Sequence, residues 1–201
     1  AEGDKVARAA CLAGPVAVLL AWLVIAVSVS VNPWFSIWRD AFSDLGGPQA
    51  RYPWIYNYGM VVVASLIMMY GACMVGSGLN KFHYVGGSFF VVAGMFLAMV
   101  GIYHEGTYPH VFVSHWFFYQ ADLSVLAWGI GSIKAGHRTA GYLEVAVALG
   151  GPLGADLIRW PSAATLEAYG IALIDVFALL VYYELTFVTR HSTQLTVGTS
   201  R

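Results

Sequence analysis

The sequence predicts an all-α, polytopic membrane protein: a single domain over 1–201 with six transmembrane helices and one extra amphipathic helix in the outer interface. Of its 201 residues, 59% are hydrophobic and only 10% are charged, whereas soluble domains carry about 25% charged residues. No Lys, Arg, Asp or Glu occurs within 9–38, 52–80 or 82–104. Each of these gaps is longer than the ~20 residues that cross a bilayer.

The apolar runs divide the chain into its predicted spans. They lie at about 9–31, 56–75, 84–103, 111–133, 140–157 and 168–188. Lys5 and Arg8 precede the first run, as they would in a signal peptide. That run is too long for a typical signal sequence and five more follow it, so we interpret it as a retained helix. Gly87, Gly94 and Gly101 repeat every seven residues in the third span, which predicts a small-residue face for close helix packing.

The longest connection between predicted spans contains a helical pattern of its own. Its apolar side chains recur at helical spacing over 34–45, and Gly46-Gly47-Pro48 follows. We predict an amphipathic helix over 34–45 that lies in the outer interface and covers the bundle. Trp34, Trp38 and Trp54 would anchor it at the level of the lipid headgroups.

Basic residues predict the orientation, because cytoplasmic loops carry an excess of Lys and Arg. One side of the predicted bundle collects Lys5, Arg8, Lys81, Lys134, Arg138, Arg190 and Arg201, and the other collects Arg39, Arg51 and Arg159. Both termini are therefore predicted to be cytoplasmic, in a multi-pass protein of the cell membrane. The net charge of −1 argues against a nucleic-acid partner. Cys11 and Cys73 fall in apolar runs and are predicted to be buried thiols, neither disulfide-bonded nor metal-bound.

Candidate catalytic residues come from the stretch 101–128, which contains three histidines and two carboxylates. His115 and Asp122 are seven residues apart and lie within about 20° of each other around a helix. Tyr119 belongs to the same stripe. Because a charged group in lipid is costly, we expect this stripe to face protein or a wet cavity. His115 would be a general base and Asp122 would orient it.

Further polar residues gather in the outer half of the predicted bundle and are candidates for ligand binding. They are Asp44, His104, Glu105, His110 and Glu167. Their spacing matches no zinc motif, so neither a metal nor another cofactor is predicted. No GxSxG sequence surrounds Ser43 or Ser114, so the pattern gives little support to a serine nucleophile.

The segment Ser43-Asp44-Leu45-Gly46, followed by Trp54 and Asn57, resembles the signature of a six-helix prokaryotic membrane family catalogued as domain of unknown function 998. The resemblance continues through Gly94, Gly101, Glu105, a histidine after the third span (His110 or His115) and Glu167. It implies six membrane helices and a polar site facing outward, and it implies no established activity. The chain is also distantly similar to eukaryotic six-helix membrane proteins linked to autophagy and lipid-anchor remodelling.

Three functions are compatible with these patterns. The first is a structural or accessory membrane protein, with membrane lipid around it and a homo-oligomer or larger membrane complex as its assembly. The second is an outer-leaflet lipid-binding or lipid-hydrolysing protein that uses the His and carboxylate cluster. The third is a transporter of protons or small solutes along Asp122 and Asp175, although no inverted repeat of the kind common in transporters is visible.

Overall fold

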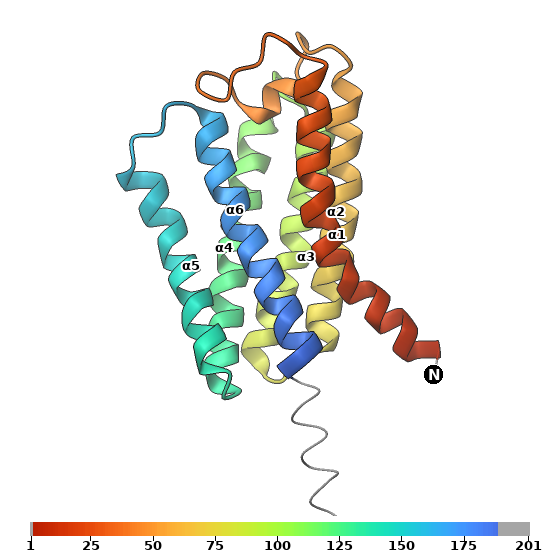
Figure 1. Cartoon of the computed structure of the whole chain (residues 1–201), viewed down its shortest axis with the longest axis vertical. Coiled ribbons are helices and arrows are strands. Elements are labelled where there is room, and N and C mark those ends of the chain that lie inside the picture. The colour runs from red at the N-terminus through yellow and green to blue at the C-terminus, as the bar shows by residue number, and fades with distance from the viewer. Residues whose placement is uncertain (1, 189–201) are drawn as a thin grey trace, which may run out of the picture.

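The computed structural model describes the backbone of residues 2–188 and the side chains of residues 11–186. Within that part the chain is all α-helical and contains no strand. The helices are α1 (Glu2–Ser30), η1 (a 3₁₀ turn, Phe42–Gly46), α2 (Pro53–Gly76), α3 (Lys81–Ile102), α4 (His110–Lys134), α5 (Arg138–Leu157), α6 (Ala163–Tyr183) and η2 (a π-helical turn, Glu184–Val188). The six α-helices run alternately up and down, so α1 begins at the end of the bundle where α6 finishes (Figure 1). The prediction of an all-α chain is confirmed.

Four of the described helices are long and apolar enough to cross a bilayer, which indicates a membrane protein. These segments are Cys11–Ser30, Pro53–Gly76, Lys81–Ile102 and Ala163–Thr186. Helices α4 and α5 have 25 and 20 residues, but they are less apolar and do not qualify on composition. That all six helices span the bilayer stays a prediction from the sequence.

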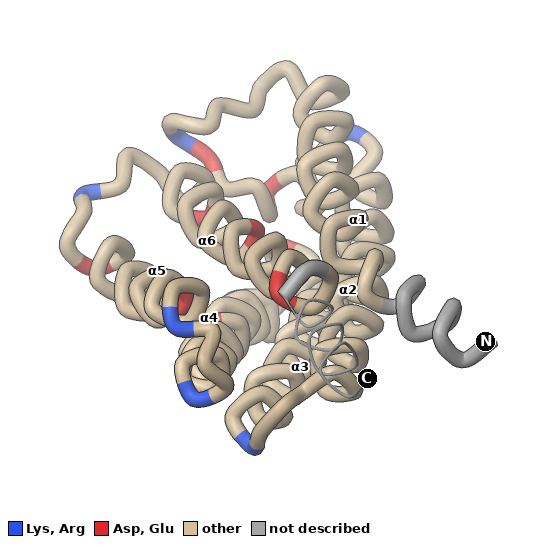
Figure 2. The backbone as a smooth tube through the Cα atoms, turned by 60° about the horizontal axis from the view of Figure 1, so that its bottom comes forward, with Lys and Arg blue, Asp and Glu red and all other residues tan. Residues whose placement is uncertain are grey.

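We call the two ends of the bundle the terminal end and the loop end. The terminal end contains the start of α1, the connections 77–80 and 135–137, and the end of α6. The loop end contains the connections 31–52, 103–109 and 158–162. Basic residues lie at helix ends and in connections, whereas acidic residues also lie along α6 (Figure 2).

The predicted small-residue face of α3 is confirmed and sets how closely α3 packs on α2. Gly87, Gly94 and Gly101 all face α2. A Cβ atom added at Gly94 would lie 2.7 Å from Met68 Cγ and 3.0 Å from the Ala64 carbonyl oxygen. A larger residue would therefore force the two backbones apart.

The predicted helix over 34–45 is wrong, because the connection forms turns and then only the short η1. Side chains bind the backbone groups that a helix would need: Asp40 Oδ2 accepts from Ser36 N at 2.7 Å, and Arg39 Nη2 donates to the Trp34 carbonyl at 2.7 Å. Such local bonds compete with helix formation. Hydrogen bonding to Arg39 also holds the pKa of Asp40 below its usual value. The segment still covers the loop end, because Phe42 and Leu45 are buried.

Asn32 holds this long connection against the end of α1. Its side chain is 1% exposed. Asn32 Nδ2 donates to the carbonyls of Ser28 at 2.8 Å and Arg51 at 3.2 Å. Its Oδ1 accepts from Trp34 Nε1 at 3.0 Å and from Arg51 N at 2.6 Å. The hydrogen-bonding capacity of the amide is therefore completely used.

We expect the Asn32→Ala substitution to lower the free energy of unfolding by roughly 2 kcal/mol, because it leaves buried backbone groups without partners. Gln49, in the same connection, is exposed, and Gln49→Ala is the matched control, with a change below about 0.5 kcal/mol. Thermal denaturation of both variants in detergent measures the difference. Equal melting temperatures would show that Asn32 does not hold the connection.

The prediction that both cysteines are unpaired is also wrong, because Cys11 and Cys73 form a disulfide between α1 and α2. The sequence places each cysteine in an apolar helix, but only the antiparallel packing of the two helices brings their Cα atoms to 5.4 Å, within disulfide range. Both residues lie in candidate membrane spans, and Cys73 is 7% exposed.

Candidate functional site

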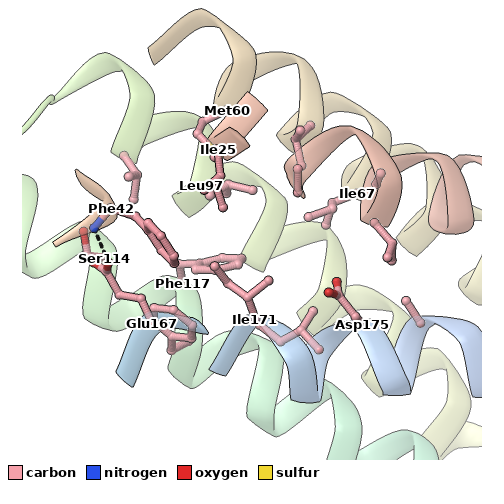
Figure 3. A pocket seen from close by; sticks show the side chains of 18 of the residues that line it. Ile25, Phe42, Met60, Ile67, Leu97, Ser114, Phe117, Glu167, Ile171 and Asp175 are labelled. Atoms are coloured by element: carbon pink, nitrogen blue, oxygen red, sulfur yellow. Dashed lines mark hydrogen bonds between the residues drawn. The ribbon is translucent and has the colours of Figure 1, made fainter. Parts of the chain in front are cut away.

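A cavity lies inside the bundle, between α1, α2, α3, α4 and α6, and the η1 segment covers it at the loop end (Figure 3). Its wall is almost entirely apolar. The apolar lining is Ala17, Val18, Ala21, Ile25, Phe42, Met60, Val63, Ile67, Phe90, Leu97, Val100, Phe117, Phe118, Ile171, Ile174 and Ala178, with Gly14 and the rings of Tyr56 and Tyr70. No Lys or Arg is among the described residues that line it.

The cavity is long and narrow. Lining residues extend along α1 from Gly14 to Ile25 and along α6 from Glu167 to Ala178, which corresponds to about 16 Å on each helix at 1.5 Å per residue. The volume of the cavity is only about 80 Å³. A space of this shape fits one extended hydrocarbon chain better than a ring system or a compact polar solute.

The loop end of the cavity is polar. Glu167, in the second turn of α6, accepts a hydrogen bond from the backbone N–H of Phe42 through Oε2 at 2.7 Å. Ser43 and Ser114 line the same end, and Figure 3 shows Glu167 and Ser114 beside Phe42, with Asp175 further along α6. The bond from Phe42 fastens η1 to α6 and positions a carboxylate at the end of an apolar cavity.

His110 and Glu105 lie directly behind this polar end. His110, at the start of α4, is buried, and its Nδ1 donates to the Tyr103 carbonyl at 2.7 Å. Its Nε2 lies 3.0 Å from Glu105 Oε2 and 3.4 Å from Ser114 Oγ. Ser43 Oγ donates to the same Glu105 oxygen at 3.5 Å. Since Nδ1 carries the proton given to Tyr103, the contact with Glu105 requires a second proton between the ring and the carboxylate.

Four of the five predicted ligand-binding residues meet here. Asp44 caps η1 by accepting from Ala41 N at 2.8 Å, and both Asp44 and Glu105 lie close enough to Glu167 for their charges to act on it. His110 completes the group. The exception is His104, whose Nδ1 donates to the backbone carbonyl of Glu105 at 2.8 Å. Of the five residues, Glu167 alone lines the cavity itself.

The two predicted catalytic residues lie outside the cavity. His115 is exposed and its ring bonds to the Val111 carbonyl at 2.7 Å, and Tyr119 is 56% exposed. The expectation that this stripe faces protein is therefore not met at these two positions. Asp122 is half-buried and faces Gly151 of α5. The inward face of α4 carries His110, Ser114 and Phe117 instead, and His115 is displaced from Ser114 by about 100° around the helix.

Sequence reasoning gave little weight to several residues that the fold brings to the cavity. Ser114 is one helical turn from His110, and this four-residue spacing was the signal that could have found it. Tyr56 is buried near Glu167 and Asp44. Asp175 accepts from Trp22 Nε1 of α1 at 2.7 Å, a pairing between residues far apart in the sequence.

The arrangement has the chemistry of a binding site for an amphiphile. The carboxylate of Glu167 lines one end, Asp44 and Glu105 lie close enough to act on it by their charges, and no Lys or Arg is among the described residues of the wall. Among the described residues, no three His, Cys, Asp or Glu side chains are grouped so that they could hold a metal ion.

Comparison with known proteins identifies one family. A family model described as "Protein of unknown function (DUF998)" matches residues 15–183. No curated protein and no solved structure matches the chain.

Proposed function

The chain belongs to the DUF998 family, and from that premise we propose that it is a membrane protein that binds a single-chain amphiphile in the cavity of the bundle. The observation that carries the proposal is the form of the cavity: an apolar interior about 16 Å long with Ser43, Ser114 and Glu167 at its loop end. Asp175, the other carboxylate in the described wall, is hydrogen-bonded to Trp22. Such a space binds a hydrocarbon chain by removing apolar surface from water or from the lipid headgroup region.

The charge at the polar end selects the headgroup. The carboxylate of Glu167 and the hydroxyls of Ser43 and Ser114 line this end, Glu105 lies close enough to act on Glu167 by its charge, and the described cavity wall contains no Lys or Arg. A phosphate or carboxylate headgroup would bring another negative charge to this position and would be repelled. We therefore propose that the headgroup is cationic or uncharged, with N–H or O–H donors that these oxygens accept.

Entry from the side of the bundle is consistent with the packing of α6. This helix contacts its neighbours less extensively than α2, α3 and α4 contact one another. Trp22 of α1 and Asp175 of α6 join the two helices by a hydrogen bond beside the cavity. Separation of this pair would open the cavity toward the surrounding lipid.

Filling the cavity is the direct test. Ala17 is 4% exposed and lines the wall, so Ala17→Phe places a ring where the hydrocarbon chain would lie. We expect gently purified wild-type protein to retain a bound amphiphile in native mass spectrometry and the Ala17→Phe variant to lose it. Ala26 on the same helix is exposed and lies outside the wall, which makes Ala26→Phe the matched control that keeps the ligand.

The same experiment separates this proposal from a purely structural role. If the role is purely structural, the melting temperature and the assembly of the protein do not depend on a bound amphiphile, and the cavity of the wild-type protein is empty. Wild-type protein without bound amphiphile, or equal occupancy in the Ala17→Phe and Ala26→Phe variants, would refute the binding proposal.

Hydrolysis of a bound ester is a second candidate, favoured by the 3.4 Å contact between Ser114 Oγ and His110 Nε2. The proton between His110 Nε2 and Glu105 would first have to move fully to Glu105, which frees the ring nitrogen. Ser114 Oγ would then attack the acyl carbon, His110 would pass the serine proton to the departing alcohol, and water would cleave the acyl-serine to the acid. Glu105 competes for the same ring nitrogen at 3.0 Å, so binding is the better supported function. Release of acid from a long-chain ester by wild type but not by Ser114→Ala would establish hydrolysis.

A further inference from the structure

A second polar cluster lies buried at the terminal end of the bundle, whereas the polar end of the cavity is at the loop end. It contains the carboxylates of Glu144 from α5 and Glu184 from η2, which are 0% and 3% exposed. The two side chains are in contact and their charges repel. Two buried carboxylates in contact are costly unless a cation neutralises one of the charges.

Glu184 is well supplied with donors. Its Oε2 accepts from Trp128 Nε1 at 3.0 Å and from Ser132 Oγ at 3.0 Å, both on α4. His137 Nδ1, in the connection before α5, lies 3.5 Å from Glu184 Oε1. These contacts stabilise Glu184 as the ionised member of the pair.

Glu144 differs, because neither of its carboxylate oxygens accepts a hydrogen bond from a described donor. Ser132 Oγ also approaches it, but the single hydroxyl hydrogen of Ser132 is donated to Glu184. His83 continues the same network: its Nδ1 accepts from Leu79 N at 3.2 Å, so its Nε2 carries the proton that faces Ser132 Oγ at 3.3 Å. A fully buried carboxyl group with no donor requires a proton or another small cation.

We propose that Glu144 and Glu184 form a proton-binding site in which one proton is shared between the two carboxylates. A proton satisfies both groups at once, because protonated Glu144 donates to Glu184 and no longer carries a charge. A metal ion would need further ligands, and no three His, Cys, Asp or Glu side chains are grouped for that purpose among the described residues.

Proton exchange with water would pass through His137. Its side chain is 17% exposed at the terminal end and also reaches Glu184, so it links the buried pair to the aqueous side. The other titratable groups around the pair are His83 on α3, Tyr70 on α2 and Tyr182 on α6. Tyr70 donates its hydroxyl hydrogen to the Ala178 carbonyl at 2.8 Å, so it does not donate to the two carboxylates.

Infrared spectroscopy tests the site because a protonated carboxyl group has its own C=O stretching band, which shifts in D₂O. We expect the difference spectrum between wild-type protein and either Glu144→Gln or Glu184→Gln near neutral pH to contain such a band, because each substitution removes the shared proton and leaves the other buried carboxyl groups in place. The amide of the Glu144→Gln variant can replace the shared proton by donating to Glu184, so this variant should fold. Asp156 on the same helix as Glu144 is exposed, and Asp156→Asn should leave the band unchanged.

Three results would overturn the proposal. The first is wild-type protein with no protonated-carboxyl band near neutral pH. The second is a band that persists at full intensity in whichever of the two Gln variants folds. The third is loss of the band on addition of sodium at constant pH together with a higher melting temperature, which would identify a sodium site.

Discussion

Replacing Trp128 by Ala is expected to cause the largest loss of stability of any substitution considered for this chain. Trp128 is 1% exposed, stacks on His83 with ring centroids 4.2 Å apart, and donates to Glu184. The substitution leaves a cavity between α3 and α4 and takes one donor from a buried carboxylate. We expect the free energy of unfolding to fall by about 3–5 kcal/mol.

Trp116 provides the matched control, since it is also on α4 but is 38% exposed. The Trp116→Ala substitution should cost less than about 1 kcal/mol. Chemical denaturation in mixed micelles compares the two variants on the same scale. Similar losses for Trp116→Ala and Trp128→Ala would contradict the account of the terminal end.

Removing the carboxylate of Glu167 is expected to have the largest effect on binding. The Glu167→Ala variant loses both the acceptor that holds Phe42 N and the charge at the polar end of the cavity. We expect affinity for a long-chain primary amine to fall at least tenfold, which corresponds to about 1.4 kcal/mol. Competition against a photoreactive long-chain amine in detergent measures the change.

The conservative variant Glu167→Gln separates the two contributions of this residue. Its amide oxygen can still accept a hydrogen bond from Phe42 N, so η1 should still cover the cavity. Binding of a long-chain alcohol should then be retained, whereas binding of the amine should weaken. If neither Glu167→Ala nor Glu167→Gln changed the affinity for either probe, Glu167 would not contact the headgroup.

Much of the fold could be predicted because each helix is a long apolar run whose pattern is local in the sequence. Structure begins earlier than predicted at α1, at Glu2, where polar residues continue the helix beyond the apolar core. The segment 34–45 has helical periodicity, but Asp40 and Arg39 bind backbone groups that the helix would have used. Periodicity does not reveal such competition.

The candidate site was harder to predict because it depends on which face of a helix is turned inward. A seven-residue spacing places His115 and Asp122 on one stripe, yet their stripe is turned away from the cavity. The disulfide between Cys11 and Cys73 and the contact between Glu144 and Glu184 join different helices. Each requires knowledge of helix packing that no single-helix pattern contains. Asp44, Glu105, His110 and Glu167 converge because their loops and helix starts share the loop end.

The central claim, that the cavity holds a single hydrocarbon chain, is tested most directly by a density map of the wild-type protein in a lipid nanodisc prepared without detergent. The account predicts one continuous, unbranched density between Ala17 of α1 and Ile171 of α6, with a wider headgroup density beside Ser114 and Glu167. A cavity closed by the movement of Phe42 and Phe117 into it, with no elongated density, would contradict the claim.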